Sequence, residues 1–93
     1  MNTLDDHTIR TALEDLEGWE RRDATIHRSF SCDDFRAAIA FINRIADLAD
    51  AADHHPELFN VYATVEVTLT SHDAGGITEK DIALARAIND VAA

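Results

Sequence analysis

The stretch from Asp50 to His72 reads D-A-A-D-H-H-P-E-L-F-N-V-Y-A-T-V-E-V-T-L-T-S-H, and it decides how the chain folds. Before Pro56 the apolar residues follow helical spacing, and after it apolar and polar residues alternate. A residue that precedes proline avoids the helical region, so Pro56 sets the latest possible end of the helix before it. Three of the five histidines also lie in this stretch. Candidate chemistry and a change of secondary structure therefore coincide.

A long helix is predicted upstream of the histidine pair. Apolar residues recur at intervals of three and four between Phe35 and Ala49, as on a helix with one buried face. Ser31 and Asp34 resemble a capping box at its start. If the helix persists far enough, Asp50 and His54 lie one turn apart.

Two strands and a last helix are predicted downstream. Apolar and polar residues alternate from Leu58 to Thr70, with a break near Ala63 that divides the run into two strands. Gly75 and Gly76 form a flexible corner. The segment 78–81 fits the start of a helix. Its expected buried stripe consists of Leu84, Ala85, Ile88 and Val91.

The N-terminal part predicts a short helix and two more strands. Asp5 or Asp6 can cap the helix, and Gly18 can end it. The segment 19–31 reads as two short strands with a turn near Asp23. The order is helix, two strands, helix, two strands, helix. Because the strands come in adjacent pairs, we expect an α+β two-layer domain, with a four-stranded antiparallel sheet and three helices on one face.

Length and charge limit the classes of function. We expect one domain, 1–93, that buries only a modest fraction of its surface, so oligomerisation would bury more. With 18 acidic against 8 basic residues, the net charge of −10 argues against nucleic acid and anionic membranes as partners. A lone Cys32 excludes an internal disulfide. Since we see neither a signal peptide nor an apolar run of membrane-spanning length, we expect a cytoplasmic protein.

The candidate chemistry rests on His54, His55 and His72. The sequence has no phosphate-binding glycine loop, Cys-x-x-Cys pair, nucleophile elbow or dinucleotide fingerprint. Histidine titrates nearest neutrality, so a pocket with two or three of them can take a proton from one substrate atom and give one to another. That chemistry suits a dehydration or an isomerisation. We expect no metal, because the spacing matches no closed zinc pattern.

Simpler interpretations of these residues stay open. The pair His54-His55 could be a helix C-terminal feature that interacts favourably with the helix dipole. Asp81 could be only the N3 residue of a capping box behind Thr78, and Asp50 a solvated helix residue. Four other residues are given ordinary structural roles: His7 and His27 on the surface, and Phe59 and Tyr62 in sheet packing.

Several motifs follow one another along the chain. They are Gly18-Trp19, Ile26-x-Arg28-x-Phe30, Asp50-x-x-x-His54-His55-Pro56-Glu57, Phe59-Asn60-Val61-Tyr62, Val65-x-Val67-x-Leu69-Thr70-x-His72 and Gly75-Gly76-Ile77-Thr78-x-x-Asp81. Together they resemble the pterin-4a-carbinolamine dehydratases over most of the chain. The resemblance implies an α-β-β-α-β-β-α fold and a homo-oligomer, usually a dimer or tetramer.

The resemblance also implies an activity, that of a 4a-hydroxytetrahydrobiopterin dehydratase. The reaction removes water from the pterin-4a-carbinolamine and gives the quinonoid dihydropterin that is recycled to tetrahydrobiopterin. It needs a base for the N5 proton and an acid for the departing 4a-hydroxyl, with no cofactor. We expect His54 and His72 to be this pair and His55 to bind and orient the pterin.

The resemblance implies supporting residues and an alternative. Asp50 or Asp81 would orient an imidazole. Pro56 and Glu57 would contact the substrate beside the histidine pair. Leu58 stands where the family often has an aromatic residue, which bears on substrate affinity. The alternative is a non-catalytic pterin-binding protein or a dimerisation cofactor of a transcription factor, since both occur among relatives.

Overall fold

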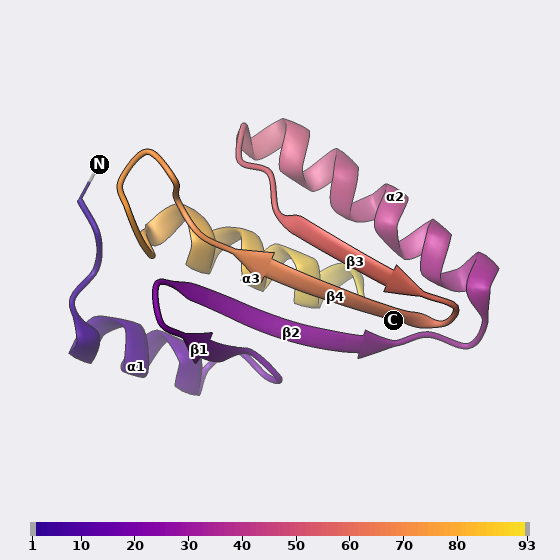
Figure 1. Ribbon diagram of the computed structural model, residues 1–93, viewed down its shortest axis with the longest axis horizontal. Helices are drawn as coiled ribbons and strands as arrows, with labels where there is room; N and C mark the ends of the chain where they lie inside the picture. Colours follow the sequence, from indigo (N-terminus) through magenta and orange to yellow (C-terminus); the bar gives the residue numbers. More distant parts are fainter. Residues whose placement is uncertain (1, 93) are drawn as a thin grey trace.

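A computed structural model describes residues 2–92, and their fold agrees with the predicted class. The order of elements is α-β-β-α-β-β-α, as Figure 1 shows. Their bounds are α1 (Asp6–Glu14), β1 (Glu20–Arg22), β2 (Thr25–Ser31), α2 (Phe35–Ala52), β3 (Glu57–Val61), β4 (Thr64–Leu69) and α3 (Glu79–Val91). No helix in this part of the chain is both long enough and apolar enough to span a membrane.

The strands form one antiparallel sheet in the order β1-β2-β4-β3. The central pair is β2 and β4, in which Arg28 lies opposite Val67 and Phe30 opposite Val65. Within residues 2–92, β3 pairs only with β4, so it is an edge strand. The sheet brings the end of β4 close to the start of β3, because the two strands are antiparallel (Figure 1). This end of the sheet also faces the beginning of α3.

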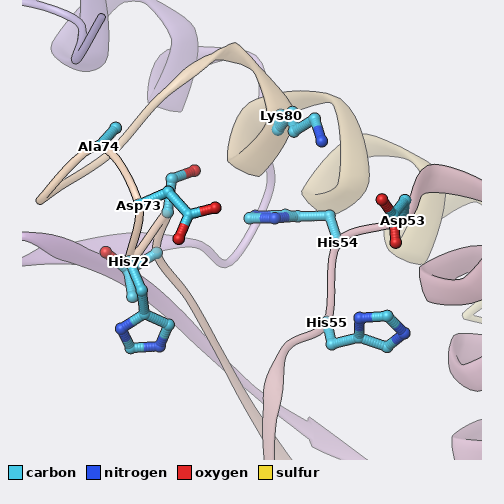
Figure 2. A pocket seen from close by; sticks show the side chains of 9 residues that line it. Asp53, His54, His55, His72, Asp73, Ala74 and Lys80 are labelled. Carbon is cyan, nitrogen blue, oxygen red and sulfur yellow. The ribbon is translucent and has the colours of Figure 1, made fainter. Parts of the chain in front are cut away.

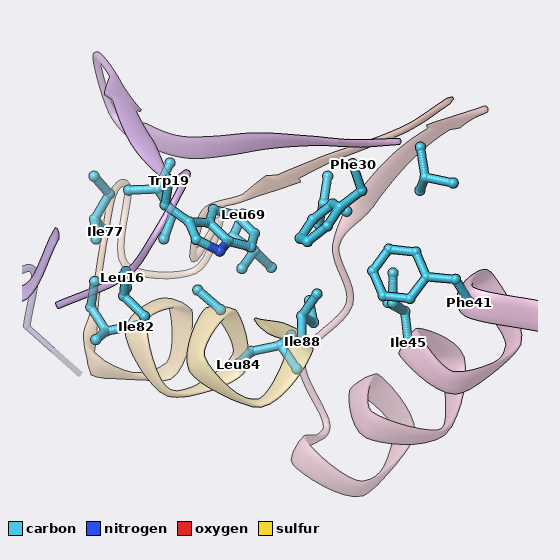
Figure 3. Close-up of a cluster of buried hydrophobic side chains, with 14 of the residues drawn as sticks. Leu16, Trp19, Phe30, Phe41, Ile45, Leu69, Ile77, Ile82, Leu84 and Ile88 are labelled. Atoms are coloured by element: carbon cyan, nitrogen blue, oxygen red, sulfur yellow. The ribbon is translucent and has the colours of Figure 1, made fainter. Parts of the chain in front are cut away.

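One hydrophobic core fills the space between the sheet and the helices. Alternation along β2 and β4 turns Phe30 and Leu69 towards it, and Figure 3 shows both beside side chains of α2 and α3. The Phe30 ring packs edge-on against Phe41, with 4.8 Å between ring centroids. Since α1, α2 and α3 all contribute to this core, the three helices cover one face of the sheet. The helix residues involved include Ile9, Phe41, Ile45, Leu84 and Ile88.

The first helix ends earlier than predicted. Asp5 is its N-cap, and its carboxylate accepts a hydrogen bond from the Thr8 N–H at 2.8 Å. The helix ends at Glu14, whereas Gly18, with φ of 84°, ends the turn that follows. The turn between β1 and β2 contains Asp23 in the left-handed region, close to its predicted place.

The long helix begins and ends differently from its sequence pattern. Its N-cap is Asp34, whose carboxylate accepts from the Ala37 N–H at 2.8 Å. Ser31 is the last residue of β2, so the capping box predicted for Ser31 and Asp34 is wrong. The helix ends at Ala52, and Asp53 adopts the left-handed conformation with φ of 50°. His54 therefore lies outside the helix.

Three of the ordinary roles given to single residues are wrong. His27 is buried on β2, where its Nε2 lies 2.9 Å from Glu66 Oε1 on the adjacent strand. Phe59 and Tyr62 are 59% and 68% exposed, so neither packs into the sheet of its own chain. Tyr62 lies in the turn between β3 and β4, in the left-handed region with φ of 49°. His7 is exposed on α1, as predicted.

Candidate active site

The three predicted histidines line one cavity of about 460 Å³. His54 and His55 come from the link between α2 and β3, and His72 from the loop that follows β4. Figure 2 shows the ring of His54 extending towards the loop that carries His72 and Asp73, with Lys80 of α3 above it. A concave site with a few convergent polar groups is typical of small-molecule binding. Its other lining residues are Asp53, Thr70, Ser71, Asp73 and Ala74.

The link between α2 and β3 sends its two imidazoles in opposite directions. Asp53 ends α2 in the left-handed conformation, and the His54 N–H then donates to the Ala49 carbonyl at 3.0 Å. From there the chain is extended, and successive side chains of an extended chain point to opposite sides. In Figure 2 the ring of His54 points towards the loop of His72, while the ring of His55 points away from it. The pair therefore cannot share one task.

His54 is held by a buried carboxylate. Its Nε2 lies 2.5 Å from Asp81 Oδ1, and the side chain of Asp81 is fully buried. The other carboxylate oxygen, Oδ2, accepts from the Thr78 N–H and from the Ser71 hydroxyl, both at 2.9 Å. The capping box of Thr78 and Asp81 is thus confirmed. The same carboxylate that caps α3 also contacts the histidine.

Asp50 contacts His55 and not His54. The distance from His55 Nε2 to Asp50 Oδ1 is 3.0 Å, and both side chains are mostly exposed. The predicted one-turn relation between Asp50 and His54 required a longer helix, and α2 ends at Ala52 before that turn is complete. Asp50 holds His55 only weakly, because water and salt screen an interaction between two exposed side chains. The two imidazoles are therefore unequally fixed.

Two expected substrate contacts do not line the cavity. Pro56 is half-buried and Glu57 is exposed at the start of β3, where the chain leads away along the sheet edge. Leu58 is also outside the lining. Their roles towards a substrate stay predictions. Within residues 2–92, no group of three or more His, Cys, Asp or Glu side chains is arranged to hold a metal ion.

Of the lining residues that the sequence did not single out, Lys80 and Ser71 bear most on the chemistry of the site. Lys80 lines the cavity from the first turn of α3, between Glu79 and Asp81. A cation there opposes the helix dipole, and this mismatch was a readable signal. Ser71 is buried, and its hydroxyl contacts Asp81. This contact arises because the loop after β4 packs against the start of α3, so the residues next to Ser71 in the sequence do not indicate it.

The fold and the cavity define a small α+β protein with a site of histidines and carboxylates. A family model described as "Pterin 4 alpha carbinolamine dehydratase" matches residues 2–91. The chain belongs to this family, as its motifs indicated.

Relatives and solved structures agree with this assignment. Proteins provisionally named pterin-4-alpha-carbinolamine dehydratase include one from Thermomicrobium roseum, 48% identical over 92 residues and covering 99% of both chains. Another, from Rhodopseudomonas palustris, is 53% identical over 93 residues, covering 97% of this chain and 91% of the relative. The crystal structure of a transcriptional coactivator/pterin dehydratase from Brucella melitensis has a TM-score of 0.95 and 42% identity, covering 99% of this chain and 100% of that one.

Proposed function

We propose that the chain is a 4a-hydroxytetrahydrobiopterin dehydratase, a hydro-lyase that acts on the pterin-4a-carbinolamine. The N5–H and C4a–O bonds of the substrate break, a C4a=N5 double bond forms, and water leaves. Membership of the family supports this reaction, as do the names of relatives that are 48% and 53% identical to the chain. The product is a quinonoid dihydropterin, which places the reaction in the recycling of tetrahydrobiopterin.

One observation carries the proposal, namely that His54, fixed by Asp81, shares a cavity with His72. An ionised carboxylate can only accept, so His54 donates its Nε2–H to Asp81, and the neutral imidazole then has its lone pair on Nδ1. That nitrogen takes the N5 proton as general base. His72, from the loop on the other side of the cavity, gives a proton to the departing hydroxyl. His55, held near Asp50, orients the pterin.

The proposed enzyme is a homo-oligomer. Within residues 2–92 the backbone groups on the outer side of β3 have no strand partner, and such an edge readily pairs with another chain. Phe59 and Val61 of this strand are exposed on the sheet face that carries no helix. A second copy that paired with β3 would cover the edge and these apolar side chains together.

A second candidate function is protein binding through α2. Phe35 and Ile39 of this helix are large apolar side chains that remain exposed. The Brucella melitensis structure carries a coactivator label beside its dehydratase label, which concerns that protein. A chain that captures a regulator and does not turn over a 4a-hydroxypterin would favour this role.

The direct test uses enzymatically generated 4a-hydroxytetrahydropterin in a stopped-flow assay. We expect the chain to accelerate the appearance of the quinonoid dihydropterin above the spontaneous rate in proportion to its concentration. A rate that is independent of added protein contradicts the proposed activity. Binding of a pterin analogue without any acceleration assigns the chain to the non-catalytic pterin-binding alternative.

A further inference from the structure

We propose that Ser71 is a positioning residue, which acts through Asp81 to fix the proton arrangement of His54 and which anchors the loop of His72. Its effect on turnover rests on the proposed dehydratase function. Its effect on the imidazole does not, because that effect follows from hydrogen bonding alone.

The backbone of Ser71 anchors the loop that carries His72. Its N–H donates to the Gly76 carbonyl at 2.9 Å. Its own carbonyl accepts from the N–H groups of Ala74 at 3.1 Å and Gly75 at 2.9 Å. Gly75 has φ of 80°, a conformation that favours glycine and lets the loop turn back. The loop thus closes upon Ser71, and the residue next to it is His72.

The side chain of Ser71 lies in a buried polar network. Its Oγ is 2.7 Å from Thr78 Oγ1 and 2.9 Å from Asp81 Oδ2. All three residues are buried. Every buried side-chain nitrogen or oxygen in the described part of the chain has a hydrogen-bond partner. A saturated network of this kind has little freedom to rearrange its protons.

Counting donors assigns the protons of this network. Asp81 as a carboxylate only accepts, so the single hydroxyl proton of Ser71 points to Asp81 Oδ2. The contact between Ser71 and Thr78 then requires Thr78 to donate. Oδ2 receives the Ser71 hydroxyl and the Thr78 N–H, which leaves Oδ1 for His54. The neutral imidazole of His54 therefore carries its proton on Nε2, and its Nδ1 stays free to accept one.

Loss of the Ser71 hydroxyl would loosen the hold of Asp81 on His54, while the backbone bonds of Ser71 to the His72 loop stay. Asp81 Oδ2 would keep only the Thr78 N–H, so the carboxylate could rotate about its bond to Cβ and release Oδ1 from the imidazole. Thr78 would lose the acceptor for its hydroxyl proton. Rotation of the carboxylate removes the constraint that selects one tautomer of His54.

The test compares Ser71→Ala with Ser29→Ala, which removes an exposed hydroxyl from β2 far along the chain. The first readout is the tautomer of His54, from long-range ¹H–¹⁵N correlation spectra without substrate. We expect the Nε2–H form in the wild type and in S29A, and a mixture of both tautomers in S71A. The second readout is turnover, in which S71A should lower kcat about tenfold with little change in KM, as expected for one lost hydrogen bond.

Ser71→Cys covers the case in which the alanine variant does not fold, because it replaces the hydroxyl by a weaker donor of similar size. It should give an intermediate tautomer ratio. An unchanged His54 tautomer in S71A, or an Nδ1–H form in the wild type, overturns the proposal. If the wild type shows the Nε2–H form but no dehydration, the proposed function fails while the role of Ser71 stands.

Discussion

Asp81 combines two tasks in one side chain, since it caps α3 and contacts His54. The simpler interpretation of the sequence made Asp81 a helix-capping residue, whereas the family resemblance implied that it orients an imidazole. The cap is confirmed, and the role in the site stays a prediction. The two are compatible because the two carboxylate oxygens face different partners: Oδ2 faces Ser71 and the Thr78 N–H, and Oδ1 faces the imidazole. A single substitution therefore affects both stability and the candidate chemistry.

Asp81→Asn tests this double role. The amide supplies one acceptor oxygen where the carboxylate supplies two, so either the helix cap faces a donor with a donor, or His54 moves its proton to Nδ1 and loses the free lone pair there. We expect a loss of about 1–3 kcal/mol in the free energy of unfolding, measured with urea, and a fall in kcat/KM of at least about tenfold. Asp90→Asn, an exposed aspartate of the same helix, is the control. A D81N variant with wild-type turnover would separate Asp81 from the reaction.

The sequence could identify the histidines at this scale but not all their partners. His54, His55 and His72 stood out because imidazoles near neutrality are suited to proton transfer, and they do line one cavity. Which histidine Asp50 contacts depends on where α2 ends. The left-handed conformation of Asp53 sets that end, and helical spacing in the sequence does not reveal it. The role of Ser71 could not be predicted, because it rests on a contact between the loop after β4 and α3, and no local sequence pattern indicates such a contact.

At the scale of elements, the start of α3 carries a charge that does not suit a helix. Lys80 lies in the first turn, where the dipole favours anions, and it lines the cavity. Lys80→Gln should leave the melting temperature equal or slightly higher and weaken the binding of a pterin analogue. Scanning calorimetry and a fluorescence titration measure the two effects. Arg86→Gln, on an exposed position of α3 outside the cavity lining, should change neither greatly. Unchanged binding in K80Q would contradict a role for Lys80 in the site.

The start of α1 predicts a pH dependence. The hydrogen bond from the Thr8 N–H lowers the pKa of Asp5 below its ordinary value. Since the folded-state value is the lower one, the stabilisation is present above the unfolded-state pKa and is lost as pH falls through the folded-state pKa. We expect Asp5→Ala to be less stable than the wild type near neutrality, with a difference that shrinks in acid. Urea unfolding at several pH values measures it, and a constant difference would contradict the assignment.

Element types were predictable, whereas several boundaries were not. The change from helical spacing to alternation at Pro56 separated α2 from β3, and adjacent strand pairs gave the antiparallel sheet. Ser31 was assigned to a helix cap because Ser and Asp both suit that position, but pairing with β4 extends β2 through Ser31. Tertiary pairing overrode the local preference there.

At the scale of the whole molecule, a small chain leaves apolar surface to cover. Phe59 of the edge strand β3 is exposed on the open sheet face, and we expect oligomerisation to bury it. Phe59→Lys should shift the molar mass measured by light scattering towards that of one chain. Ser29→Lys, on the same sheet face but on β2, is the matched control. A wild-type chain that is monomeric at all concentrations would contradict the expectation.

In the proposed reaction, His54 and His72 transfer the two protons of the elimination. Stopped-flow dehydration of 4a-hydroxytetrahydropterin by His54→Ala and His72→Ala tests it most directly, with His7→Ala, on an exposed position of α1, as the control. We expect each site variant to lose about 10²-fold or more in rate while its fold persists, and H7A to keep the wild-type rate. Wild-type rates in both H54A and H72A would contradict it.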